Sequence, residues 1–148
     1  MKSLACCVLL ILLAGCSRSR DQQEQERVQV LLEEQRAAAL AARARILAAD
    51  HAQLLTESRQ LLGEERVIMA GEAAMLPPSI RSLQPCRVSV HTNAVQIDFS
   101  AGLHHQYVWA YSPGADSGEE LFPENFNTNN FVAHVKLGDG LWYHENYW

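Results

Sequence analysis

The stretch from residue 21 to 62 constrains the fold of this chain most, because it contains neither glycine nor proline. Alanine, leucine, glutamine, glutamate and arginine dominate it, and these residues have high helix propensities. The sequence therefore predicts one long helix here, with Gly63 as its C-cap. At ~1.5 Å per residue, such a helix would be roughly 60 Å long.

Leucine recurs every seven residues within this stretch, at Leu40, Leu47, Leu54 and Leu61. This spacing, with alanine at companion positions, is typical of a weak coiled-coil seam. A helix this long cannot bury its apolar stripe against a small C-terminal domain alone. Three arrangements stay open: self-association through the leucine stripe, which we favour, packing of the last third on the C-terminal part, or a helix lying on a membrane.

The first sixteen residues have the features of an export signal. A basic residue, Lys2, precedes an apolar run over residues 4–13. This run is too short to cross a bilayer, which needs roughly 20 residues. Its end, Leu13-Ala14-Gly15-Cys16, resembles the lipobox of bacterial lipoproteins, in which an apolar residue and two small ones precede a cysteine.

The resemblance implies that residues 1–15 are removed as a signal peptide and that the thiol of Cys16 is acylated. Membrane lipid is then a partner of the protein, because two or more acyl chains give stable anchoring. Residues 16–20 would form a lipidated linker. Ser17 follows the cysteine where an aspartate favours the inner membrane, so the resemblance implies a periplasm-facing lipoprotein with the outer membrane favoured.

The formal net charge of −5 argues against nucleic acid as a partner, because a binder needs basic charge to neutralise phosphates. Most of the acidic excess lies in the second half of the chain. Apolar and charged residues otherwise occur in the proportions of an ordinary globular protein.

After the predicted helical stalk, residues 21–69, the pattern changes to that of a small head domain over residues 70–148. A proline-started helical turn is predicted over residues 76–83. Alternating apolar residues then predict strands over residues 86–90, 95–99, 107–111, 131–137 and 141–147. The predicted class is α+β, with a long N-terminal helix followed by a small antiparallel sheet of four to five strands and one short helix. The segment LPPSIRSLQPCRVSVHTNAVQIDFSAG resembles a helix-then-hairpin pattern of uncharacterised exported bacterial proteins, which implies the fold alone.

Cys86 is the one cysteine left after processing and acylation, so no intrachain disulfide is expected. Its strand phase matches Val88 and Val90, which indicates a side chain facing inward. A buried thiol, a bridge between two copies and a reactive thiol stay open as alternatives.

Five of the six histidines fall in the head: His91, His104, His105, His134 and His144. One alternative is a metal site in which His104 and His105 gather with Asp98 and His91 around one ion. The spacing matches no recognised metal motif, and adjacent histidines on a strand point to opposite faces. Nucleophilic motifs are also lacking, and Glu119, Glu120 and Glu124 lie in a polar loop. We therefore expect no catalytic residue, metal ligand or cofactor.

Large aromatic residues are concentrated in the second half of the chain, where they either build the core or form a recognition patch. The candidate binding surface consists of Tyr107, Trp109, Tyr147, Trp148, His104 and His105. The predicted function is that of a membrane-anchored, non-enzymatic binding or scaffolding protein. The alternative is a small periplasmic metal-binding protein or enzyme that uses the head histidines.

Overall fold

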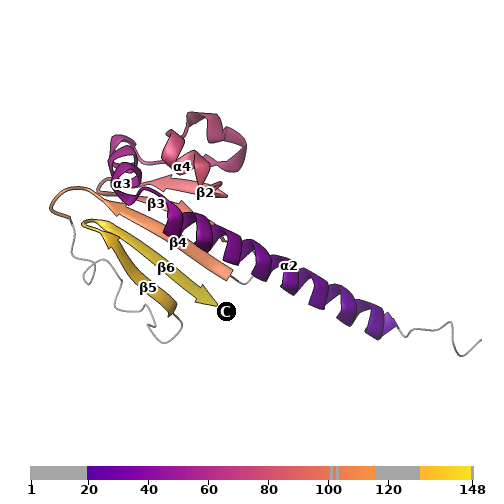
Figure 1. Ribbon diagram of the computed structural model, residues 1–148. Coiled ribbons are helices and arrows are strands. Elements are labelled where there is room, and N and C mark those ends of the chain that lie inside the picture. Colours follow the sequence, from indigo (N-terminus) through magenta and orange to yellow (C-terminus); the bar gives the residue numbers. More distant parts are fainter. Residues whose placement is uncertain (1–19, 101, 103, 116–130, 148) are drawn as a thin grey trace, which may run out of the picture. The chain divides into compact units, whose positions relative to one another are not determined.

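The structure is a computed structural model that describes residues 20–100, 102, 104–115 and 131–147, with the backbone alone at 131, 132 and 147. Contacts divide the chain into two compact units, the N-terminal unit (residues 1–34) and the sheet domain (residues 35–148). The fold is α+β: a long helix, an antiparallel sheet and short helices, as the sequence predicts (Figure 1). The signal peptide, Cys16, the loop glutamates and Trp148 lie outside the described residues.

The predicted single helix over residues 21–62 is wrong in one respect, because it is interrupted after Ala48. Helix α2 spans Arg20–Ala48 and helix α3 spans His51–Gln60. Asp50 caps α3 with a carboxylate that accepts a hydrogen bond from the backbone N–H of Gln53 at 3.0 Å. The ring Nε2 of His51 lies 2.9 Å from the carbonyl oxygen of Ile46, which satisfies a backbone group at the end of α2.

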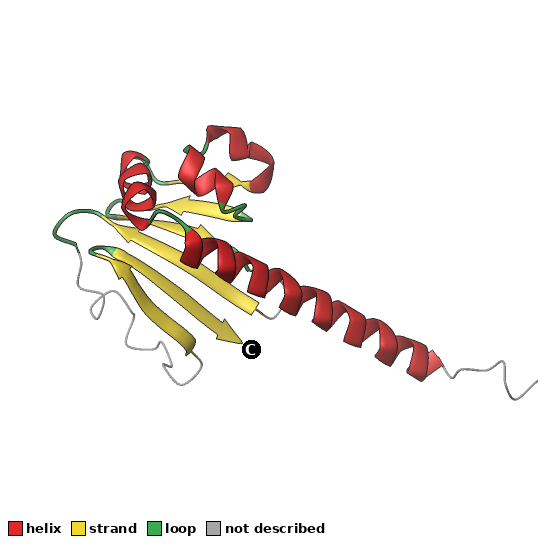
Figure 2. Cartoon of the chain, viewed as in Figure 1, coloured by secondary structure: helices red, strands yellow, loops and turns green. Residues whose placement is uncertain are grey.

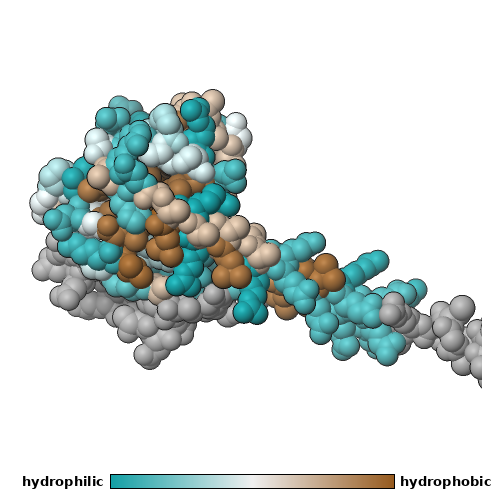
Figure 3. Space-filling model, in the orientation of Figure 1, coloured by the Kyte–Doolittle hydropathy of each residue, from teal (hydrophilic) through white to brown (hydrophobic). Residues whose placement is uncertain are grey.

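Residues 20–34 of α2 form the described part of the N-terminal unit. Large apolar side chains on this helix are about half exposed, namely Val28, Val30, Leu31 and Leu32. Figure 3 shows such apolar residues among hydrophilic ones along the helix. Helix propensity, rather than burial of an apolar stripe, therefore accounts for the helix in this unit.

The sheet has six antiparallel strands in the order β1-β2-β3-β4-β6-β5. Their bounds are β1 Arg66–Met69, β2 Arg87–Val90, β3 Ala94–Asp98, β4 His104–Tyr111, β5 Phe131–Gly138 and β6 Leu141–Tyr147. The two predicted hairpins, β2–β3 and β5–β6, are confirmed. Strand β1 was not predicted, and it adds a sixth strand that pairs with β2 at the edge of the sheet.

Short helices cover one face of this sheet. The 3-10 helix η1 (Ala70–Met75) and helix α4 (Pro78–Ser82) follow β1, and α3 and α4 lie on the same side of the strands in Figures 1 and 2. Ile46, Leu54 and Ile80 bring the side chains of α2, α3 and α4 into the core, and all three are fully buried. The sheet contributes its buried valines, isoleucines and Tyr143 to the same cluster.

The leucines of the seven-residue repeat have two different environments within the sheet domain. Leu54 and Leu61 are buried in the core, whereas Leu40 and Leu47 remain about half exposed. The break at Asp50 separates the two pairs, because α3 begins after it. The stripe is therefore not one continuous exposed seam.

Candidate functional site

The strand register assigns every sheet residue to one of two faces, because neighbouring side chains on a strand point in opposite directions. Val88, Ile97, Val108 and Tyr143 lie opposite one another across four strands and form the core face. The residues between them share the other face, which we call the aromatic face. It carries Arg87, Ser89, His91, Gln96, Asp98, His105, Tyr107, Trp109, Tyr111, His134, Lys136, Trp142 and His144.

Aromatic rings line strand β4 on this face. The ring centroids of Trp109 and Tyr111 are 5.9 Å apart with planes 9° from parallel, and His91 stacks on Trp109 at 5.6 Å. His105 lies beside Tyr107, with its Nδ1 atom 3.1 Å from the tyrosine hydroxyl. Stacked ring pairs contribute about 0.5–1.5 kcal/mol each beyond their buried area. Tyr111 is buried, whereas His105, Tyr107 and Trp109 are half buried, so these three rings form the accessible part of the stack.

Two histidines meet directly across strands β5 and β6. The Nδ1 atoms of His134 and His144 are 2.8 Å apart, so one Nδ1 donates a hydrogen bond and the other accepts it. His144 is buried, and burial together with the neighbouring His134 lowers its pKa to about 3. Partial burial of its ring also lowers the pKa of His134. Both imidazoles are therefore neutral at neutral pH.

Trp142 and Lys136 border this histidine pair. The indole of Trp142 stacks on His134 with centroids 4.7 Å apart. The ammonium of Lys136 lies 5.7 Å from the Trp142 ring centroid and forms an ion pair with Asp139 at 3.1 Å. The side chain of His134 is thus held from one side by an aromatic plane.

Asp98 anchors a second polar group at the β2–β3 end of the aromatic face. Its carboxylate accepts hydrogen bonds from the guanidinium of Arg87 at 2.8 Å and from the backbone N–H of Ser100 at 2.8 Å. The thiol of Cys86 donates to the carbonyl oxygen of Asp98 at 3.1 Å. The prediction that Cys86 faces inward is wrong: the residue begins the turn into β2 and is exposed. Partial burial of the sulfur and then the charge of Asp98 raise the pKa of this thiol, which keeps it protonated.

The core face holds a buried polar cluster that the sequence did not reveal. The side-chain amide of Gln106 donates to the carbonyl oxygen of Ala39 at 3.0 Å and to the hydroxyl of Tyr143 at 3.0 Å. That hydroxyl donates to the carboxylate of Glu145 at 2.9 Å, and Arg43 lies 3.5 Å from the same carboxylate. Burial and the neighbouring Glu145 raise the pKa of Tyr143. The cluster fixes residues 39–43 of α2 on the sheet.

The residues considered as metal ligands from the sequence do not come together. His104 and His105 are adjacent on β4 and belong to opposite faces, while Asp98 is held by Arg87. Among the described residues, no three side chains of the His, Cys, Asp or Glu type are placed to share a metal ion. Of the predicted binding surface, Tyr107, Trp109 and His105 share the aromatic face. The side chain of Tyr147 and all of Trp148 lie outside the described part of the chain.

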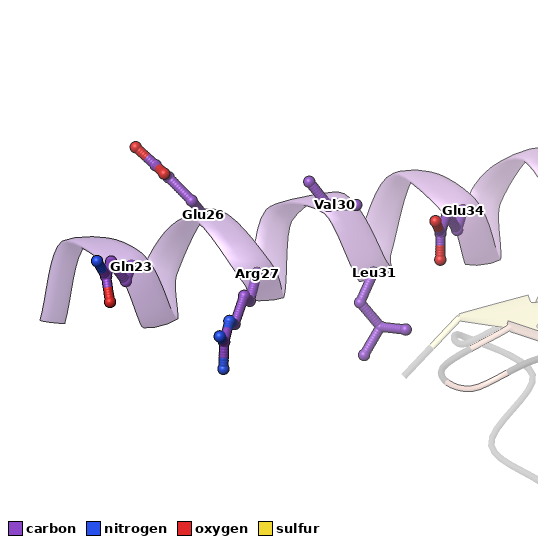
Figure 4. Close-up of a pocket in the computed structure, with 6 residues that line it drawn as sticks. All are labelled: Gln23, Glu26, Arg27, Val30, Leu31 and Glu34. Carbon is purple, nitrogen blue, oxygen red and sulfur yellow. The ribbon is translucent and has the colours of Figure 1, made fainter. Parts of the chain in front are cut away.

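A shallow hollow on the N-terminal unit carries no binding site. It is lined by Gln23, Glu26, Arg27, Val30, Leu31 and Glu34. All six belong to one helix, and Figure 4 shows their side chains projecting from it in different directions. Since no second described element of that unit closes the hollow, a ligand there would stay largely in solvent.

The fold and the two faces define a small α+β domain attached to a helix, and comparison with known proteins does not narrow this class further. No family model matches the chain, and neither the curated proteins nor the solved structures yield a match. Within the described residues, no helix is both long enough and apolar enough to span a bilayer.

Proposed function

We propose that this protein is a lipid-anchored protein of the bacterial cell envelope that acts by binding or scaffolding rather than by catalysis. The observation that carries the proposal is the pattern Leu13-Ala14-Gly15-Cys16 at the end of a short apolar run. Acylation of Cys16 would supply stable membrane attachment, because each buried methylene contributes about 0.8 kcal/mol. Ser17 after the cysteine favours the outer membrane, with the protein facing the periplasm.

Helix α2 suits the role of a spacer in this proposal. It begins at Arg20, four residues after Cys16, and its residues 20–34, which precede the sheet domain, correspond to roughly 22 Å at ~1.5 Å per residue. Along the chain, its first part separates the acylated cysteine from the sheet domain. Exposed apolar residues on this part are too few and too mixed with charge to form a core.

The aromatic face is the surface that we propose for binding. Tyr107 and Trp109 are half buried there. Trp109 lies opposite Gln96, and Gln96 lies opposite Ser89, so large ring area adjoins hydrogen-bonding groups. Tyrosine and tryptophan are enriched in recognition surfaces because they offer contact area at a small cost in conformational entropy. The partner classes that suit this chemistry are a peptide, a glycan or a neighbouring protein.

Self-association stays part of the proposal in a narrower form. Leu54 and Leu61 are buried in the core, so a seam between two copies would use Leu40 and Leu47. Sedimentation of the full-length protein in detergent tests this point. A dimer that becomes a monomer on Leu40→Ser and Leu47→Ser substitution supports the seam, and a monomeric parent protein contradicts it.

Replacement of Cys16 tests the anchoring. Cys16→Ser removes the acylated thiol, so we expect the protein to leave the membrane fraction and to lose incorporation of a labelled fatty acid. Cys7→Ser is the matched control, because Cys7 lies within the predicted signal and leaves with it. Retention of the Cys16→Ser variant in membranes with unchanged fatty-acid labelling would contradict the proposal.

A photo-crosslinking amino acid tests the binding surface in intact cells. Placed at Gln96, on the aromatic face, it should give a discrete adduct. Placed at Gln60, an exposed residue of α3, it should not. The use of two glutamine positions leaves the stacked rings in place. Equal yields of cross-linked adduct from both positions, or no adduct from Gln96, would contradict a binding role for the aromatic face.

A further inference from the structure

The pair formed by His134 and His144 is placed where a metal ion can be chelated. The two residues lie directly opposite each other in the β5–β6 ladder, and β5 is the edge strand of the sheet. His134 is exposed, so its side chain can be reached from solvent, whereas His144 is buried and fixed. This combination provides access on one side and a rigid ligand on the other.

We propose that the Nδ1 atoms of His134 and His144 together bind one divalent transition-metal ion, with copper(II) preferred over zinc. Imidazole nitrogen is a common ligand of both ions, and copper(II) lies higher in the order of divalent affinities. The proposal does not depend on lipid anchoring or on a partner for the aromatic face.

The separation of the two nitrogen atoms favours copper(II) geometry. Two ligands in neighbouring corners of a square plane, each at about 2.0 Å from the metal, are about 2.8 Å apart. Two ligands of a tetrahedral ion at the same bond length are about 3.3 Å apart. The observed distance between the Nδ1 atoms is 2.8 Å. Square-planar coordination would therefore require less movement of the rings than tetrahedral coordination.

The ring orientation agrees with this geometry. The centroids of the two imidazoles are 4.5 Å apart, with planes tilted by 55°. This centroid distance is too short for two rings that point at each other end-on across a 2.8 Å gap. Both rings are therefore inclined to the line between their Nδ1 atoms, as two ligands of one ion must be.

The protonation states pose little obstacle to binding. One Nδ1 already accepts a hydrogen bond and carries no proton. The other must pass its proton from Nδ1 to Nε2 through solvent, which leaves both Nδ1 lone pairs on the metal and releases no net proton.

The surroundings limit how tightly the ion is held. No third His, Cys, Asp or Glu of the described residues joins the pair, so water would complete the coordination. The indole of Trp142 supports the ring of His134 from one side. The Lys136 ammonium lies over the Trp142 ring, and its ion pair with Asp139 reduces its effect on a cation at the site.

The test is a calorimetric titration of the untagged full-length protein in detergent with copper(II) and, separately, with zinc. We expect one copper(II) per chain, weaker zinc binding and an electron paramagnetic resonance spectrum with two nitrogen ligands. His134→Gln and His144→Gln should each weaken copper(II) binding by at least about tenfold, which is about 1.4 kcal/mol. His134 is exposed, so its variant keeps the test valid if the buried His144→Gln variant unfolds.

Two controls separate this site from adventitious binding. His91→Gln removes a histidine of the same face that stacks on Trp109 and lies outside the pair, and Cys86→Ser removes the exposed thiol. Both variants should bind copper(II) as the parent protein does. Unchanged copper(II) affinity in His134→Gln, or an equal loss in His91→Gln or Cys86→Ser, would overturn the proposal.

Discussion

The N-terminal unit and the sheet domain differ in how far their large apolar side chains are buried. In residues 20–34, Val28, Leu31 and Leu32 are about half exposed on a helix. In the sheet domain, side chains of the same kind, such as Leu54 and Ile80, are completely buried. Burial of apolar area is the main source of folding stability. Most of the folding stability should therefore come from the sheet domain. The proposed role of the N-terminal unit, a spacer, depends on its position in the chain and not on a core of its own.

The largest expected difference in the free energy of unfolding is between leucine-to-alanine variants of the two units. Leu54→Ala leaves a cavity in the core, so it should lower the free energy of unfolding by about 2–5 kcal/mol. Leu31→Ala truncates a half-exposed side chain, so it should change the free energy of unfolding by about 0.5 kcal/mol or less. Urea denaturation of the full-length variants measures both. Equal losses would show that the N-terminal helix is part of the cooperative core.

Within the sheet domain, we expect a smaller difference in stability between variants of the core face and variants of the aromatic face. Tyr143→Phe removes a hydroxyl that donates to the buried Glu145 and accepts from Gln106. The loss should be about 1–3 kcal/mol, because the buried carboxylate then loses one of its hydrogen-bond donors. Tyr107→Phe on the aromatic face removes the contact with His105 and should cost less, since that site is half buried. A larger loss of unfolding free energy in Tyr107→Phe than in Tyr143→Phe would contradict the assignment of the core face as the more tightly packed one.

The next expected change in stability, in order of size, comes from the cap residue at the break between α2 and α3. Asp50→Ala removes the cap of α3 and should lower the free energy of unfolding by about 1 kcal/mol. Asp50→Asn retains a capping acceptor and is the matched control. Denaturation curves of the two variants should differ, and identical stabilities would mean that tertiary packing alone sets the break.

The smallest effect concerns the contact between α3 and α4. The Glu57 carboxylate accepts hydrogen bonds from the backbone N–H of Ser79 at 2.8 Å and from the side-chain amide of Gln53 at 2.8 Å. The hydrogen bonds with Ser79 and then Gln53 lower the pKa of the Glu57 carboxyl below its ordinary value. Its contribution to stability is thus complete above about pH 4.5 and is lost as the pH falls through the lowered pKa. Glu57→Gln should flatten this part of the stability–pH curve, and an unchanged curve would contradict the contact.

Local patterns were sufficient to predict part of this fold. The β2–β3 and β5–β6 hairpins follow from alternating apolar residues around short polar or glycine-containing turns. Strand β1 was missed because Ile68 continues the seven-residue spacing of Leu54 and Leu61, so it resembled the end of the helical repeat. The helix break had a signal in the sequence: Asp50 followed three residues later by Gln53 is a capping pattern.

The histidine pair could not be predicted from the sequence, because it depends on a register shift. The turn pairs Gly138 with Leu141, and regular continuation from there would place His134 opposite Glu145. An irregularity between Lys136 and Gly138 moves the ladder by one residue and places His134 opposite His144 instead. The polar cluster at Gln106 likewise depends on the tertiary contact with Ala39, which is far away in sequence.

In the function that we propose, the chain acts at a membrane through an acylated Cys16. Mass spectrometry of the N-terminal tryptic peptide, from protein purified out of bacterial membranes, tests it most directly. We expect a peptide that begins at Cys16, ends at Arg18 and carries the added mass of at least two acyl chains. An unmodified tryptic peptide spanning residues 3–18, with the signal still attached, would contradict it.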